Sequence, residues 1–179
     1  MPEKDHHYTV KVTWTGNLEC DRLRSRTCAN RKRESPSQKR GPGTTSYAAF
    51  SRAHTIESNG KPPIQGSSDP AFRGDPTSWN PEQLLLAALS TCHQLWYLHL
   101  CAEAGIIVTA YQDHAEATMH EETSGAGQFT TVTLRPRVTI TATSDAAKAQ
   151  ALHHHAHEMC FIARSVNFPV HTEATIEMQ

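Results

Sequence analysis

The chain has 179 residues, of which 37% are hydrophobic, so it is long enough for one domain with a sizeable core. Its net charge of −1, with histidine neutral, excludes a protein held to nucleic acid by its overall charge. The five cysteines are an odd number and follow an N-terminus without an export signal, which argues against a disulfide scaffold and predicts a reducing, cytoplasmic location.

The N-terminal part of the chain predicts strands around a basic insertion. Residues 8–14 alternate between β-forming and polar residues, which predicts a strand. Residues 18–43 carry a charge of +5, leaving −6 for the rest, and lack periodic apolar residues, so we interpret them as a solvated loop insertion in a single domain. Three predicted segments follow: a strand at 47–56, an extended piece at 61–64 and a loop at 66–78 that contains Arg73.

A long central helix is the clearest predicted element. Asn80 is a good N-cap, Pro81 suits the first helical position and Gly105 supplies the end. A helix over residues 81–104 would be about 36 Å long. Because residues 84–89 are apolar on every side, we expect the helix to be surrounded by protein. Polar residues beyond them argue against a membrane span.

The second half of the chain predicts alternating strands and helices. In the strand at 129–143, four apolar residues share one face: Val132, Leu134, Val138 and Ile140. The other predicted elements are a strand at 106–120, a helix at 145–159, a short helix within 160–167 and a final strand at 171–178. This order predicts an α+β fold.

Two cysteines stand in positions that suit thiol chemistry. Cys92 lies inside the long helix, and Cys160 comes far downstream at the end of the second helix. A cysteine with the usual pKa of about 8.5 is mostly protonated at neutral pH, and a nearby arginine would favour its thiolate and bind a peroxide. A carboxylate would hold that arginine in place. The sulfenic acid formed by a peroxide needs a second cysteine to close a disulfide.

The segments around these cysteines carry a family resemblance. The first begins Asn80-Pro81-Glu82-Gln83-Leu84, continues with Ala87-Ala88 and holds Cys92; the second is Ala156-His157-Glu158-Met159-Cys160, which leads to Ser165-Val166. Together they resemble the OsmC/Ohr family of organic hydroperoxide reductases, over nearly all of the chain except residues 18–43. The chain departs from the family at His93, which follows Cys92, and at Phe161, where the family commonly has proline.

The resemblance implies a fold, an assembly and an activity. The fold would have antiparallel sheets wrapped around the central helix, in an intertwined homodimer with its active sites at the subunit interface. The activity would be reduction of organic hydroperoxides, with Cys92 as the peroxidatic thiol and Cys160 as the resolving thiol. An external dithiol, of the lipoyl type in this family, would reduce the disulfide, and the thiol chemistry needs no metal or organic cofactor.

The resemblance also implies an arginine–glutamate pair that activates Cys92. Glu82 occupies the motif position of the carboxylate, and Arg73 lies in the loop where the OsmC branch places its arginine. Arg52 is the alternative, because the other branch takes its arginine from an earlier segment. Ten residues separate Glu82 from Cys92, which is about 15 Å along one helix, so Glu82 would act from the partner subunit or through the arginine.

Other interpretations of the sequence remain open. A non-catalytic homodimer could bind a small apolar ligand and keep Cys92 merely buried. The basic segment 18–43 could contact nucleic acid, although it has no aromatic residue for base stacking. Trp96 and Tyr97 could line an apolar pocket that favours bulky peroxides.

Several cysteines and histidines are better explained without a special site. Cys101 lies about 180° around the helix from Cys92 and suits core packing. Cys20 and Cys28 lack the second ligand pair of a zinc site. His93 could pair with Cys92, but adjacent helical residues point about 100° apart. A metal site at His153 and His157 has no third ligand, so we expect a solvated, histidine-rich helix face.

Overall fold

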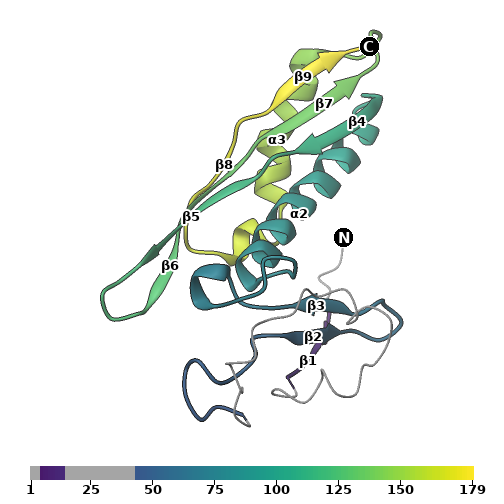
Figure 1. Ribbon diagram of the computed structural model, residues 1–179. Coiled ribbons are helices and arrows are strands. Elements are labelled where there is room, and N and C mark those ends of the chain that lie inside the picture. Colours follow the sequence, from purple (N-terminus) through teal and green to yellow (C-terminus); the bar gives the residue numbers. More distant parts are fainter. Residues whose placement is uncertain (1–4, 15–42) are drawn as a thin grey trace. The chain divides into compact units, whose positions relative to one another are not determined.

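The computed structural model describes residues 5–14 and 43–179 and divides into two compact units (Figure 1). Unit 1 is Met1–Glu82 and unit 2 is Gln83–Gln179. The insertion predicted at 18–43 lies outside the described residues, apart from Gly43, and so do Cys20 and Cys28.

Unit 1 contains a small antiparallel sheet. Its strands are β1 (Lys11–Thr13), β2 (His54–Glu57) and β3 (Ile64–Gly66), with β2 in the middle. Val12, Ile56 and Ile64 stand opposite one another, so β-branched side chains pair across all three strands. Gly60, with φ of 73°, makes the turn between β2 and β3.

The strand predicted at 47–56 is wrong over most of its length. Residues 47–49 form a turn, closed by the Ala49 N–H donating to the Ser46 carbonyl over 3.0 Å, and β2 begins only at His54. The guanidinium carbon of Arg52 lies 4.4 Å from the ring centroid of Tyr47 and 3.8 Å from that of Phe50. This cation–π stack folds the segment onto itself and overrides its β propensity.

Unit 2 packs two helices on one face of a sheet (Figure 1). The long helix α2 (Pro81–Glu103) begins at the predicted proline and is followed by Gly105, whose φ of 72° completes the C-terminal turn. Helix α3 (Ala146–Met159) starts where the Asp145 carboxylate accepts a hydrogen bond from the Lys148 N–H. The 3-10 turn η3 (Ala163–Ser165) falls within the short helix predicted at 160–167.

Six strands form two three-stranded sheets that follow one another in space (Figure 1). One has the order β4 (Val108–Asp113), β7 (Pro136–Ile140), β9 (Thr175–Met178), and the other β5 (Glu116–Glu121), β6 (Gly127–Leu134), β8 (Val170–Thr172). Strand β8 pairs in parallel with β6, and β9 pairs in parallel with β7, whereas the β4–β7 and β5–β6 pairs are antiparallel. The α+β prediction is confirmed, with sheets of mixed direction.

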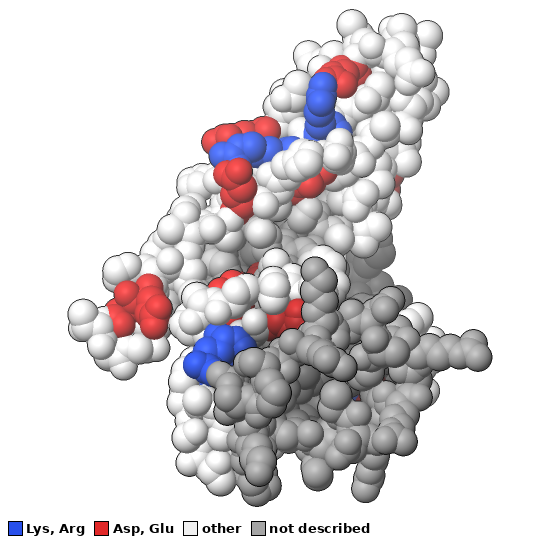
Figure 2. All heavy atoms as spheres, in the orientation of Figure 1, with Lys and Arg blue, Asp and Glu red and all other residues white. Residues whose placement is uncertain are grey.

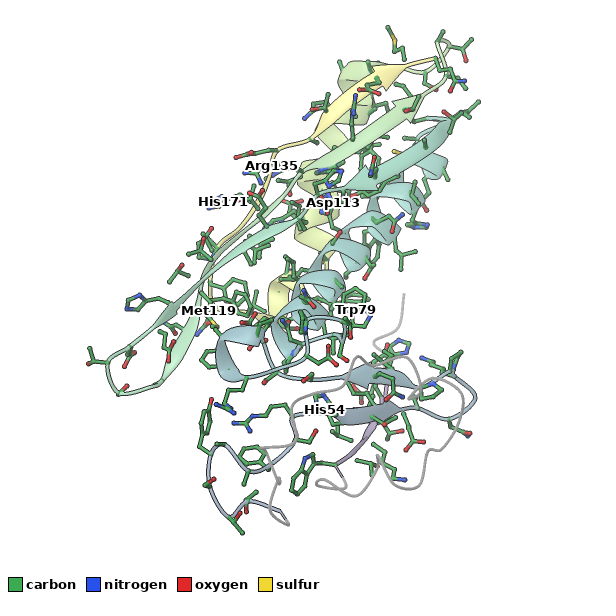
Figure 3. All side chains as sticks on the ribbon, in the orientation of Figure 1. His54, Trp79, Asp113, Met119, Arg135 and His171 are labelled. Atoms are coloured by element: carbon green, nitrogen blue, oxygen red, sulfur yellow. The ribbon has the colours of Figure 1, made fainter. Side chains whose placement is uncertain are left out.

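Each of the three long strands predicted in unit 2 is interrupted at the same level of the sheet. The Asp113 carboxylate accepts a hydrogen bond from the Arg135 backbone N–H over 2.7 Å, and the Arg135 side chain pairs with Glu116 and Glu173 (Figure 3). These charges lie where β4, β6 and β8 end. Figure 2 accordingly shows blue and red side chains adjacent to each other over the sheet. Hydrophobic periodicity cannot predict such a break, because it continues on both sides of it.

The core of unit 2 lies between the helices and the sheet. The four strand residues predicted to face inward are all buried: Val132, Leu134, Val138 and Ile140. One cluster joins the two β7 residues of this set to Tyr97 and Leu100 of α2 and Ala149 and Ala156 of α3, and a second is built around Leu89. The inward-facing residues of the strands therefore pack against α2 and fix its orientation.

Helix α2 is less enclosed by its own chain than its sequence predicts. Only 22% of its most apolar 18-residue stretch is buried, and the Leu95 side chain is 68% exposed. By length and composition alone the helix could cross a membrane, a property that core helices of globular proteins share. The expectation that protein surrounds α2 is therefore not met by the described part of this chain.

Candidate active site

Cys92 lies on α2 between the buried face of the helix and solvent. Leu89, His93, Tyr97 and Leu100, spaced at helical intervals, form the buried face. Cys92 directly precedes His93 and is half-buried, so it borders the buried face of α2.

Cys160 lies at the C-terminus of α3 and is fully buried, with 1% of its surface exposed. The chain turns tightly around it. Its carbonyl accepts the Arg164 N–H over 3.0 Å, and its sulfur accepts the Ala163 N–H over 3.4 Å. The sulfur is therefore fixed by the backbone of the turn that follows α3.

The structure brings the thiols of Cys92 and Cys160 close together, although 68 residues separate them in sequence. The Cys92 thiol is near enough to act on the pKa of Cys160, and both cysteines are free thiols. Burial, together with a smaller effect of Cys92, raises the pKa of Cys160 to about 11, while the Ala163 N–H opposes the shift. Cys160 is thus a neutral thiol at neutral pH, close to the half-buried Cys92.

An aromatic pair bridges the two cysteine-bearing segments. Trp96 is one helical turn beyond Cys92, and Phe161 directly follows Cys160. Their rings meet edge to face, with centroids 5.5 Å apart. Tyr97 does not join them: it is fully buried in the core, where its hydroxyl donates to the Ala149 carbonyl over 3.2 Å. The expectation that Tyr97 lines a pocket is therefore wrong.

In unit 1, Arg73 stands in an unusual backbone conformation. Its φ is 68°, and it is the one residue other than glycine with positive φ in the described part of the chain. Such a conformation is uncommon for a residue with a side chain and is often found at functional sites. Arg73 ends the 3-10 turn η2 (Pro70–Phe72), which Asp69 caps, and it is exposed.

Replacing Gly74 by alanine should disrupt the loop that presents Arg73. A Cβ at Gly74 would lie 1.5 Å from the Ser68 carbonyl oxygen, so the backbone would have to move. We expect a loss of stability of about 2–3 kcal/mol in urea unfolding. Ala71→Ser, at an exposed position of the same loop, is the control. Wild-type stability of Gly74→Ala would contradict the tight approach.

Arg52, the alternative arginine, lines a cavity within unit 1. The cavity has a volume of about 300 Å³ and is lined by Trp14, Thr44, Phe50, Ser51, Arg52, His54, Ser67, Ser68 and Pro81. One guanidinium nitrogen of Arg52 donates to the Phe50 carbonyl over 2.7 Å, and the other terminal nitrogen is buried without a hydrogen-bond partner among the described residues. Figure 3 labels His54, whose ring lies 3.0 Å from the Arg52 carbonyl.

Glu82 lies in the first turn of α2, ten residues before Cys92. One of its carboxylate oxygens is buried and has no hydrogen-bond partner within the described residues. The rise of the helix places Glu82 about 15 Å from Cys92 along the axis, beyond the reach of its side chain. Within one chain, Glu82 therefore does not contact the thiol.

His93 and His153 form a buried pair that sequence reasoning missed. His93 Nε2 lies 3.0 Å from His153 Nδ1, so His93 points into the core and not toward Cys92. The prediction of a wholly solvated histidine face on α3 is wrong at His153, which is 3% exposed. Its spacing from Ala149 and Ala156 was the available signal, because all three fall on one helix face. No group of three potential metal ligands occurs in the described residues.

Solved structures of known proteins share the fold of this chain. A similar solved structure is an OsmC-like protein of unknown function from Vibrio cholerae, with 29% identity and a TM-score of 0.73, covering 96% of this chain and 100% of that one. An organic hydroperoxide resistance protein from Bacillus subtilis, OhrB, shares 21% identity with a TM-score of 0.52, covering 96% and 98%. One from Legionella pneumophila shares 19% identity with a TM-score of 0.57, covering 70% and 90%.

The family match rests on the half of the chain that holds both thiols. No curated protein matches the chain. Residues 74–175 match the family described as OsmC-like protein, a range that begins just after Arg73 and includes α2, Cys92 and Cys160. The chain therefore belongs to the OsmC-like protein family.

Proposed function

We propose that the protein reduces organic hydroperoxides to alcohols with Cys92 and Cys160 as its redox pair. The observation that carries this proposal is the proximity of the two thiols, in a chain that belongs to the OsmC-like family. The hydroperoxide resistance proteins from B. subtilis and L. pneumophila share the fold, which is compatible with the same chemistry.

The accessibility of the two sulfurs suits a division of roles. The half-buried Cys92 attacks the distal peroxide oxygen as a thiolate, the O–O bond breaks, and the alkoxide takes a proton to leave as an alcohol. Cys92 is then a sulfenic acid. Cys160 loses its proton, its sulfur attacks the Cys92 sulfur, and water leaves as the disulfide forms. An external dithiol, proposed to be of the lipoyl type, returns both thiols by exchange.

The raised pKa of Cys160 supports its assignment as the resolving residue. A thiol that stays protonated at neutral pH is a poor first nucleophile, but it can donate a hydrogen bond to the Cys92 sulfur. Such a bond stabilises a neighbouring thiolate until the peroxide has reacted. In this proposal Cys92 is the first nucleophile, and Cys160 stays protonated until the sulfenic acid has formed.

Arg73, with Glu82, is proposed to activate Cys92, and Arg52 is the alternative. The left-handed backbone of Arg73 and the tight loop at Gly74 favour Arg73, since both cost conformational energy. We expect Arg73→Ala to lower kcat/KM on the order of 10²-fold, the scale of a lost transition-state contact. It should also slow alkylation of Cys92 by iodoacetamide at neutral pH. If Arg52→Ala produces both effects and Arg73→Ala neither, the roles are reversed.

Bulky hydroperoxides are the proposed substrates, because the Trp96–Phe161 pair places apolar rings beside the thiols. We expect Trp96→Ala to raise the KM for cumene hydroperoxide by about tenfold, since an aromatic contact surface is lost. Hydrogen peroxide in the same variant is the internal control, and its kcat/KM should change little. Equal losses for both peroxides would show that Trp96 supports the fold and not the substrate.

The protein is proposed to act as a homodimer in the cytoplasm, without a metal, organic cofactor, membrane or nucleic acid partner. The exposed apolar surface of α2, including Leu95, supports the dimer, because a second copy would cover it. Glu82 could then approach the Cys92 of the other subunit. Analytical ultracentrifugation of the full chain tests the assembly.

The alternative is a non-catalytic protein that binds a small apolar ligand. The cavity beside Arg52 favours it, since aromatic side chains line a volume that would hold such a ligand. Mass spectrometry after one equivalent of cumene hydroperoxide separates the two functions. Loss of two hydrogens, mapped to a Cys92–Cys160 bridge, supports the peroxidase. An unchanged mass, with both thiols still free, would leave the binding protein as the better description.

A further inference from the structure

A hydrogen bond between two buried imidazoles joins α2 to α3 in the core of unit 2. His93 and His153 are 1% and 3% exposed, and the bond between Nε2 of the first and Nδ1 of the second measures 3.0 Å. The outer nitrogens, Nδ1 of His93 and Nε2 of His153, are buried without a hydrogen-bond partner among the described residues. The proposed thiol chemistry uses neither ring.

Such a pair is a poor way to stabilise a core. Each unpaired buried nitrogen costs free energy, and apolar side chains of similar size would fill the space without that cost. What a hydrogen bond adds to an apolar contact is direction, because it forms only when both rings have the correct orientation. Buried polar pairs fix the register of packed helices in other proteins for this reason.

The hydrogen bond between His93 and His153 lies close to the thiols, so the orientation that it imposes on α2 also affects Cys92. His93 directly follows Cys92 on α2, and His153 precedes Cys160 by seven residues, about 10 Å along α3. Successive side chains on a helix point about 100° apart. When His93 points at His153, the rotation of α2 about its axis is fixed, and Cys92 is directed toward the segment of Cys160.

Neighbouring contacts hold the rings in place. The ring of Tyr97 stacks on that of His153, with centroids 3.8 Å apart, and its hydroxyl donates to the Ala149 carbonyl. Further along the same helix pair, Lys148 Nζ donates to the Ala104 carbonyl over 2.9 Å. These contacts align the helices, and the imidazole bond is the one closest in sequence to Cys92.

We propose that His93 and His153 are positioning residues that set the geometry for the Cys92–Cys160 disulfide. This inference rests on the proposed redox pair. Disulfides require Cβ atoms about 3.5–4.5 Å apart and a narrow dihedral range, so a small rotation of α2 would slow closure and weaken the bond. The imidazole bond excludes the rotated arrangements that an apolar core would allow.

The test compares His153→Leu with His153→Asn. Leucine removes the hydrogen bond and keeps an apolar side chain, whereas asparagine places a polar atom near the position of Nδ1. The readout is the equilibrium between the reduced protein plus oxidised glutathione and the disulfide plus two reduced glutathiones, followed by mass spectrometry. His154→Leu, at the adjacent exposed residue of α3, is the matched control.

We expect the equilibrium constant to fall at least tenfold in His153→Leu, a shift of about 30 mV. It should stay near the wild-type value in His153→Asn and His154→Leu. A wild-type constant in His153→Leu, or an equal fall in His153→Asn, would overturn the inference. If His153→Leu does not fold, the double variant with leucine at both positions is measured instead. Failure of that variant to fold would also overturn it, since the pair would then serve the fold itself.

The glutathione equilibrium also separates this inference from the proposed function. If cumene hydroperoxide fails to oxidise the wild type while glutathione disulfide closes the Cys92–Cys160 bridge, the peroxidase proposal fails and the positioning role is still measured. If glutathione disulfide forms no such bridge in the wild type, the positioning role is refuted directly.

Discussion

Replacing Cys92 by serine should abolish hydroperoxide reduction, with kcat/KM falling by a factor on the order of 10³ or more, as when an enzyme loses its nucleophile. A serine hydroxyl is almost fully protonated at neutral pH and is a weak nucleophile toward peroxide oxygen. Cys160 would not replace Cys92 as the nucleophile, because burial raises the pKa of the Cys160 thiol to about 11 and keeps it protonated. The measurement is peroxide consumption with a dithiol in excess.

The other cysteines supply the controls for this experiment. Cys160→Ser should still consume one equivalent of peroxide and stop at a sulfenic acid on Cys92, detectable as a dimedone adduct. Cys101→Ser should turn over normally, because Cys101 is buried in the core cluster around Tyr97. If Cys92→Ser keeps its activity, or Cys101→Ser loses it, the redox pair has been misassigned.

The sequence predicts the parts of this site that depend on local signals. The helix α2 begins at Pro81 as expected, because capping and helix-start preferences act within one turn. The inward residues of β6 and β7 are predicted because burial on one face of a strand imposes alternation. The motifs identify the two cysteine segments, and the structure adds that the Cys92 thiol is close enough to Cys160 to act on its pKa.

The remainder of the fold depends on contacts between segments far apart in sequence. The strand breaks come from Asp113, Arg135 and Glu173, which meet only in the folded sheet. The parallel pairing of β8 with β6, and of β9 with β7, places the C-terminal strands beside strands from earlier in the chain. No local pattern encodes these contacts, because each needs a partner that local reasoning does not identify.

Acid should destabilise the protein through its buried histidine pair. Burial lowers the pKa of His93 to about 4 and that of His153 to about 3, and to a smaller extent His157 lowers the pKa of His93 and His93 lowers that of His153. Asp113 partly opposes the shift at His93. In the unfolded chain both histidines would take up protons near pH 6.5, the value for a free imidazole. The two states therefore bind different numbers of protons between about pH 6.5 and pH 3–4.

The sign follows from this difference. Below about pH 6.5 the unfolded chain binds more protons than the folded one, so the free energy of unfolding falls as the pH falls, until the buried rings are protonated. A shift of one pKa unit corresponds to about 1.4 kcal/mol, so the loss from His93 alone is on the order of 3 kcal/mol. The destabilisation is small at neutral pH, where both imidazoles are mostly neutral in the folded and in the unfolded chain.

Urea unfolding from about pH 7 to about pH 4 measures this loss, and leucine at both positions isolates it. Protonated carboxylates destabilise wild type and variant alike, so the informative quantity is the difference between their pH slopes. The variant should have the flatter profile, and His154→Leu should keep the wild-type slope, because His154 is exposed.

The hydrogen bond between His93 and His153 tolerates one proton, since an imidazolium can still donate to a neutral ring. A second proton would leave two N–H groups facing each other across 3.0 Å, and we expect cooperative unfolding where that proton binds. Equal slopes in wild type and double variant would mean that the imidazoles are hydrated or already charged in the folded protein.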